Sequence, residues 1–254
     1  MLSDGESPTR EVTWAISPNS VKSCVLGRNS FILQLKDLSC WPTRNIPAAL
    51  HSKLHGRSPL LPLVKSVALA QDGCWIVIYQ DGNFAKSSTF TLQGKLKTEL
   101  EDPTEESPIK LFCFAPGGGW IILRENGHLA WERMPTGLDS LLSRRPADFP
   151  PVDHVTINSI GSWFVRFKDG YNTFDTRECD WESIPKKLEV VLIQEVRKGS
   201  DEIVVALSPS DPRDFLITIA NRYVLSCDNA LLEKSLKSSV EEIQNCEETS
   251  ASHI

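Results

Sequence analysis

Two histidines four residues apart, in the segment HSKLH, form the first arrangement that could do chemistry. His51 and His55 would lie on one face of a helix, a spacing that can place two imidazoles on one metal ion. Such a site needs further ligands, and the sequence nearby offers none. We therefore interpret the pair as part of a solvated helix face, and we predict no metal site and no cofactor.

A cysteine and a histidine at similar places in two neighbouring segments form a second arrangement. Cys113 comes four residues after Ile109, and His154 comes two residues after Val152. A thiol becomes a nucleophile when a base lies within hydrogen-bonding reach. Because cysteines in strands usually behave as small apolar core residues, we expect no catalysis from this pair.

The charge and the absence of targeting signals limit the classes of partner. The chain of 254 residues has 27 Lys and Arg against 33 Asp and Glu, a net charge of -6, which argues against a broad grip on nucleic acid or anionic lipid. Acidic Asp4 and Glu6 stand where a signal peptide would be basic, and no apolar run reaches the roughly 20 residues of a membrane helix. The odd set of seven cysteines fits a reducing compartment. We expect a soluble monomer of the cytoplasm or nucleus.

A repeat of about 44 residues runs through the chain, and its clearest landmark is an aromatic residue that starts an apolar segment. The equivalent residues are Phe31, Trp75, Trp120, Trp163 and Phe215. Such rings could stack on a ligand, but large aromatic side chains more often pack in a core. We expect them to pack between neighbouring repeats.

Each repeat closes with two leucines four residues apart, a spacing that places both on one helical face. The pairs are Leu50 and Leu54, Leu96 and Leu100, Leu138 and Leu142, Leu188 and Leu192, and Leu232 and Leu236. We therefore expect a short helical turn to pack onto the sheet at the end of each repeat.

The segments between the leucine pairs read as strands joined by tight turns. Residues 75–79, WIVIY, are apolar on both faces, which predicts a strand buried on two sides. The pairs Asp81-Gly82, Asn126-Gly127 and Asp169-Gly170 indicate hairpins in which both central residues need a positive φ.

Antiparallel units that recur at about 40 to 50 residues are typical of a β-propeller. The order of apolar strand, Gly turn, Trp-led strand and Asp-Gly hairpin resembles the repeats of regulator-of-chromosome-condensation and WD-type propellers over about residues 12 to 240. The Gly-His to Trp-Asp pairing is absent, so the resemblance implies a fold and carries over no functional residue. We predict a mainly β protein, a five-bladed β-propeller with short helical turns between its blades. The alternative is an open stack of ββα repeats.

The repeat boundaries define one domain with short ends. We predict a disordered N-terminus over 1–11, a single repeat domain over 12–240 and an acidic flexible tail over 241–254. The units span about 21–63, 64–108, 109–151, 152–200 and 201–240.

The repeated features of the sequence are structural, and we find no catalytic or cofactor-binding motif among them. This favours a non-catalytic protein-protein interaction or scaffold module with another protein as its partner. Basic residues beside the helical turns could form its partner-binding rim, namely Arg57, Arg144, Arg145, Lys186 and Lys187. The alternative is an enzyme or a binder of a sugar or metabolite, with its site in a central channel. The innermost strands would supply that site with Lys65, Lys110, Asp153 and His154.

Overall fold

The computed structural model describes a mainly β protein built of short antiparallel sheets, with one helix after each sheet. It describes residues 10–15, 21–43, 45–55, 58, 60–101, 107–146, 149–168, 179–198, 203–219, 222–227 and 229–251. None of the described helices combines the length and the apolar character needed to cross a membrane.

The described strands form five sheets, and apart from β1 in the last sheet the strands of each sheet follow one another along the chain. The first two sheets are β2 (Val21–Gly27), β3 (Ser30–Leu35) and β4 (Cys40–Pro42), then β5 (Val64–Leu69), β6 (Trp75–Tyr79) and β7 (Phe84–Lys86). The next two are β8 (Ile109–Ala115), β9 (Gly119–Arg124) and β10 (Leu129–Glu132), then β11 (Val152–Ile157), β12 (Trp163–Phe167) and β13 (Cys179–Glu182). The last is β14 (Ile203–Leu207), β15 (Phe215–Ile219) and β16 (Arg222–Cys227), joined by β1 (Arg10–Ala15).

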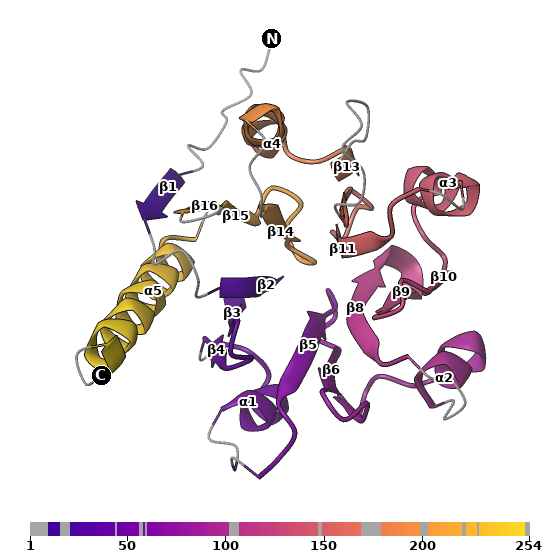
Figure 1. Ribbon diagram of the computed structural model, residues 1–254, viewed down its shortest axis with the longest axis horizontal. Helices are drawn as coiled ribbons and strands as arrows, with labels where there is room; N and C mark the ends of the chain where they lie inside the picture. Colours follow the sequence, from indigo (N-terminus) through magenta and orange to yellow (C-terminus); the bar gives the residue numbers. More distant parts are fainter. Residues whose placement is uncertain are drawn as a thin grey trace.

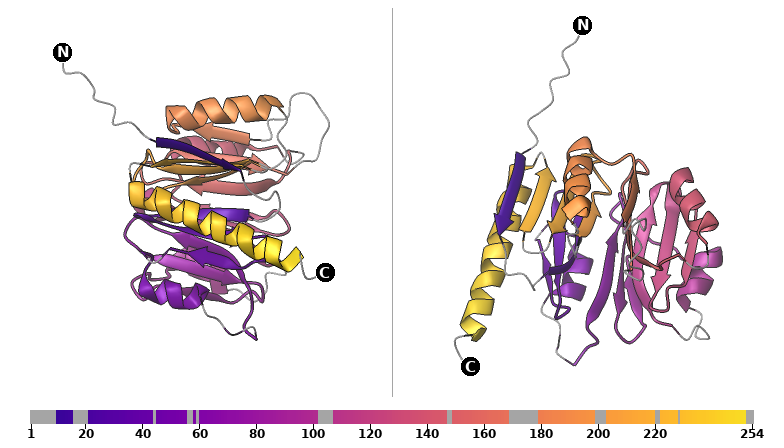
Figure 2. Two further views of the ribbon diagram at one scale, coloured as in Figure 1. Left: turned by 90° about the vertical axis from the view of Figure 1, so that its left-hand side faces the viewer. Right: turned by 45° about the horizontal axis from the view of Figure 1, so that its top comes forward.

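The strands β2, β5, β8, β11 and β14 lie toward the centre of the molecule, and the helices lie on the outside (Figure 1). Each of the inner strands β2, β5, β8 and β11 contacts the inner strand of the next sheet, and β14 contacts β2. Two further views show the sheets packed face to face (Figure 2). The helices are α1 (Ala48–Leu54), α2 (Gly94–Glu101), α3 (Thr136–Arg144), α4 (Lys186–Lys198) and α5 (Ala230–Ala251).

The core consists of five hydrophobic clusters, each of which joins two neighbouring sheets and one helix. All ten leucines of the predicted pairs lie in these helices and are buried, as their spacing indicated. The five recurrent aromatic residues are at most 4% exposed, with Phe31 and Trp75 among them, so the prediction that they pack in the core is confirmed. Burial of apolar side chains of this size supplies most of the stabilisation of such a fold.

The Asp-Gly and Asn-Gly pairs do form the predicted hairpins, but with a different turn. Gly82 and Gly127 have φ of 84° and 85°, whereas neither Asp81 nor Asn126 has a positive φ. Gly82 N–H donates to the Tyr79 carbonyl at 3.2 Å. This is the three-residue form in which a type I turn precedes a left-handed glycine. The third predicted pair, Asp169-Gly170, lies outside the described residues.

The last sheet receives a fourth strand from the N-terminal part of the chain. β1 pairs antiparallel with β16, and Arg10 stands opposite Cys227. Arg10 and Glu11 fall within the segment expected to be disordered, and residues 1–9 lie outside the described part of the chain. The outer edge of β16 would otherwise leave its backbone N–H and C=O groups without partners, and β1 satisfies them.

The C-terminal helix α5 extends through most of the segment for which we expected a flexible tail. Its residues Leu232, Leu236, Val240 and Ile243 recur at helical spacing and are all buried. The acidic residues Glu241 and Glu242 are exposed on its other side. Composition alone suggested a frayed end, but the apolar stripe continues beyond the repeat and packs the helix against β3 and β16.

Replacing Ile243 with alanine should lower the free energy of unfolding by about 2 kcal/mol, because Ile243 is 2% exposed and its loss leaves a cavity. Denaturant unfolding of the whole chain measures this change. The control is Leu231→Ala in the same helix, because Leu231 is 73% exposed and its replacement should be nearly neutral. Equal effects of the two replacements would show that the end of α5 does not pack as described.

Candidate functional site

Four of the five inner strands carry a β-bulge at the same place, their second residue. The register of β2 with β3 shifts between Val21 and Ser23, and β5, β8 and β11 shift at the equivalent position, whereas β14 pairs with β15 without a shift. The residues at the four bulges are Lys22, Lys65, Lys110 and Asp153. Because a bulge re-aims a side chain, the fold turns these four charged groups away from the regular alternation of the strand.

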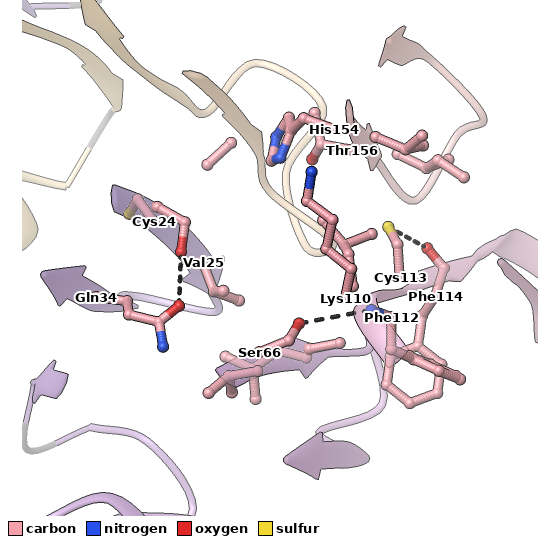
Figure 3. A pocket seen from close by; sticks show the side chains of 18 of the residues that line it. Cys24, Val25, Gln34, Ser66, Lys110, Phe112, Cys113, Phe114, His154 and Thr156 are labelled. Carbon is pink, nitrogen blue, oxygen red and sulfur yellow. Dashed lines mark hydrogen bonds between the residues drawn. The ribbon is translucent and has the colours of Figure 1, made fainter. Parts of the chain in front are cut away.

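The same four residues line one cavity of about 420 Å³ that follows the inner strands. In Figure 3 the Lys110 side chain extends toward the strand that carries His154 and Thr156, with Cys24 and Gln34 on the other side. The charged residues lie where the inner strands begin, and we call this end of the cavity the mouth. The sequence-predicted channel residues Lys65, Lys110, Asp153 and His154 all line this cavity.

Asp153 is the most strongly held charge at the mouth. It forms ion pairs with Lys110 and Arg166, and Arg166 Nε donates to Asp153 Oδ2 at 3.0 Å. Arg166 Nη1 also donates to the Ile203 carbonyl of the next sheet at 2.9 Å. Burial alone would raise the pKa of Asp153, but the two cations outweigh burial and lower that pKa to about 2.

Glu125 and two further lysines complete the mouth. Glu125 follows β9 and pairs with Lys65 across the neighbouring sheet at 2.8 Å. Lys22 forms no ion pair with any residue in the described part of the chain. Partial burial lowers the pKa of Lys22, and repulsion from Lys65 and Lys110 lowers it further, while Glu125 acts in the opposite sense.

The mouth therefore carries an excess of positive charge. The described residues that line the cavity include four cations, Lys22, Lys65, Lys110 and Arg166. They include two carboxylates, Glu125 and Asp153, so two positive charges remain uncompensated. Charges of one sign gathered in a concave, low-dielectric site raise the local concentration of ions of the opposite sign. The arrangement suits an anionic group.

Cys113 and His154 also line the cavity, but their surroundings do not activate either side chain for catalysis. Burial raises the pKa of the Cys113 thiol to about 12, and its Sγ donates to the Phe114 carbonyl at 3.4 Å. Burial lowers the pKa of His154 to about 4, and its Nε2 donates to the Val205 carbonyl at 2.8 Å. At neutral pH the thiol keeps its proton, and the imidazole is neutral and joined to the next sheet, so neither activates the other.

The other sequence candidates lie away from the mouth. The rings of His51 and His55 lie near the end of α1, tilted by 47° with their centroids 5.1 Å apart, and no group of three metal-ligating side chains is found among the described residues. The predicted basic rim is divided. Arg144 and Arg145 are at the C-terminal end of α3, whereas Lys186 and Lys187 begin α4; Arg57 lies outside the described residues.

Sequence reasoning missed three residues of the mouth, Lys22, Glu125 and Arg166. Lys22 had a signal, because Val21-Lys22-Ser23 repeats the pattern of Val64-Lys65-Ser66 at the start of the next inner strand. Glu125 and Arg166 had no such signal, because Glu125 follows the second strand of its sheet and Arg166 lies in the second strand of the next, so neither belongs to an inner strand.

Fold and site together define a mainly β protein of packed antiparallel sheets with a charged central cavity. No family model and no curated protein matches the chain. Among solved structures, the chain is similar to YCF48 bound to D1 peptide, with 11% identity over 84% of this chain and 65% of that chain and a TM-score of 0.36. It is also similar to YCF48 from Cyanidioschyzon merolae, with 10% identity over 82% of this chain and 67% of that chain and a TM-score of 0.27.

Proposed function

We propose that the five sheets form a closed five-bladed β-propeller, whose blades correspond to the units 21–63, 64–108, 109–151, 152–200 and 201–240. The contact between β14 and β2 supports closure, because an open stack of ββα repeats would leave the first and last sheets apart. One hydrophobic cluster likewise combines Leu33 of the first sheet with Leu225 of the last. Pairing of β1 with β16 supplies the last blade with its outer strand.

We propose further that the protein is a non-catalytic binding module that holds an acidic segment of another protein at the mouth. The observation that carries this proposal is the repeated bulge, which aims Lys22, Lys65 and Lys110 into one cavity with two positive charges in excess. Lys22 has no partner carboxylate among the described residues. A carboxylate of the partner protein would accept a charge-assisted hydrogen bond from the Lys22 ammonium group.

A small-ligand site in the same cavity is the second candidate, because about 420 Å³ lies in the range of small-molecule pockets. The accessible charges favour the protein partner. They lie at the mouth, where Lys22 and Glu125 are exposed, whereas the lining residues Cys24, Val67 and Phe112 are buried.

A short fluorescent peptide rich in glutamate tests the proposal. The wild-type chain should bind it, with an affinity that falls as salt is added, and Lys22→Glu should weaken binding by about tenfold or more because the reversed charge repels the peptide. The control is Lys53→Glu, which makes the same change on the exposed face of α1.

Thermal unfolding of both variants checks that each is folded before titration. Equal affinity of Lys22→Glu and Lys53→Glu for the peptide would contradict a site at the mouth.

A further inference from the structure

Three leucines are exposed in the short segment that leads into the second sheet. Leu60, Leu61 and Leu63 are 93%, 50% and 47% exposed. Single exposed apolar residues are ordinary on a protein surface, but three within four positions form a local apolar patch. We call Leu60, Leu61 and Leu63 the leucine patch. No helix or strand of the described chain covers it.

The leucine patch is held in place by backbone hydrogen bonds and directly precedes the strand that carries Lys65 of the mouth. Leu61 N–H donates to the Ser58 carbonyl at 3.0 Å, and the Leu63 carbonyl accepts from Gln80 N–H at 2.9 Å. Val64 then begins β5, and Lys65 of the mouth follows. The segment runs between α1 and the start of β5 at the periphery in Figure 1.

The distance between the two features suits a short stretch of chain. Lys65 is two residues beyond Leu63 and five beyond Leu60. Even fully extended, five residues span at most about 17 Å. A partner segment of about five extended residues could therefore reach from the leucine patch to the lysines of the mouth.

We propose that the leucine patch and the mouth form one bipartite docking surface for a segment that combines acidic and apolar residues. The inference rests on the proposed function, because it assumes that a carboxylate binds at the mouth. An acidic side chain would meet Lys22 and Lys65, and apolar side chains a few residues away would cover Leu60 and Leu61. The positive charge selects an acidic segment, and the patch beside it selects apolar neighbours for that acid.

Two fluorescent peptides of equal length and charge test this, one alternating glutamate with leucine and the other alternating glutamate with serine. The wild-type chain should bind the glutamate-leucine peptide about tenfold more tightly, because burying a leucine side chain contributes on this scale. The double variant Leu60→Ser, Leu61→Ser should lose this preference and keep its affinity for the glutamate-serine peptide.

Ile160→Ser is the matched control, because Ile160 is 67% exposed in the turn between β11 and β12, at the opposite ends of the inner strands. It should keep the preference. If wild type bound both peptides equally and Lys22→Glu weakened both, the leucine patch would have no role in binding. The proposal that the mouth binds acidic segments would still hold. Loss of the preference in Ile160→Ser would also overturn it. Binding of neither peptide would overturn both proposals.

Discussion

Asp153→Asn should lower the free energy of unfolding by about 2 kcal/mol at pH 7. The neutral amide leaves Lys110 and Arg166 without their shared carboxylate. Because both cations are mostly buried, the loss of their partner destabilises the fold. The size follows from the pKa of Asp153, which the two cations lower from 3.8 to about 2. Chemical denaturation of wild type and variant measures the difference.

The pH dependence of this difference has a definite sign. A carboxyl whose pKa is lower in the folded state stabilises the fold fully above its unfolded pKa. The contribution of Asp153 should therefore be present above about pH 4 and disappear as the pH falls toward 2. Glu132→Gln is the control, because Glu132 pairs with exposed Arg133 on the surface and its loss should be nearly neutral. A constant difference between Asp153→Asn and wild type down to pH 2 would contradict the ion-pair account.

The same substitution should strengthen binding while it weakens the fold. Removing the Asp153 carboxylate frees Lys110 and Arg166 and raises the excess of positive charge at the mouth from two to three. A glutamate-rich peptide should bind Asp153→Asn more tightly than wild type. A general loss of structure would weaken peptide binding instead. Lower stability together with tighter peptide binding would therefore show that Asp153 affects the charge of the site and not only the fold.

The second large effect concerns His154. Its pKa falls from 6.5 to about 4 because the ring is buried, so the unfolded chain binds a proton more readily between these values. Stability should fall as the pH drops from 6.5 to 4, and this one group accounts for about 3 kcal/mol of the loss.

His154→Gln should remove this part of the pH dependence, because glutamine has no such titration and its amide can still donate to the Val205 carbonyl. Unfolding free energies at pH 7 and pH 4 measure it, and the wild type should lose about 3 kcal/mol more than the variant. His55→Gln, at the exposed end of α1, should follow the wild type. If His154→Gln lost as much stability as wild type over this range, the buried neutral imidazole would be contradicted.

Features with local periodicity could be predicted from the sequence. The pairing of Leu138 with Leu142 marks a helical face, and Trp120 leads an apolar segment, so burial and secondary structure follow from spacing. The hairpin at Asp81-Gly82 could be predicted, but its turn type could not. The turn type depends on the loop length, which is set by the register of β6 and β7.

Features that depend on distant pairing could not be predicted. β1 finds its partner β16 about 200 residues away, and nothing within Arg10–Ala15 indicates that edge. The candidate site was predicted in part, because Lys65, Lys110 and Asp153 stand at the starts of inner strands. The bulges that aim them arise from the pairing of two strands and have no signature in either strand alone.

The most direct test of the central claim is a crystal structure of the full chain with a glutamate-rich peptide bound. We predict a peptide carboxylate within hydrogen-bonding distance of Lys22 Nζ, with Lys65 or Lys110 as a second donor. A peptide bound instead at Arg144 or Lys186, with none at the mouth, would contradict binding of acidic segments at the mouth.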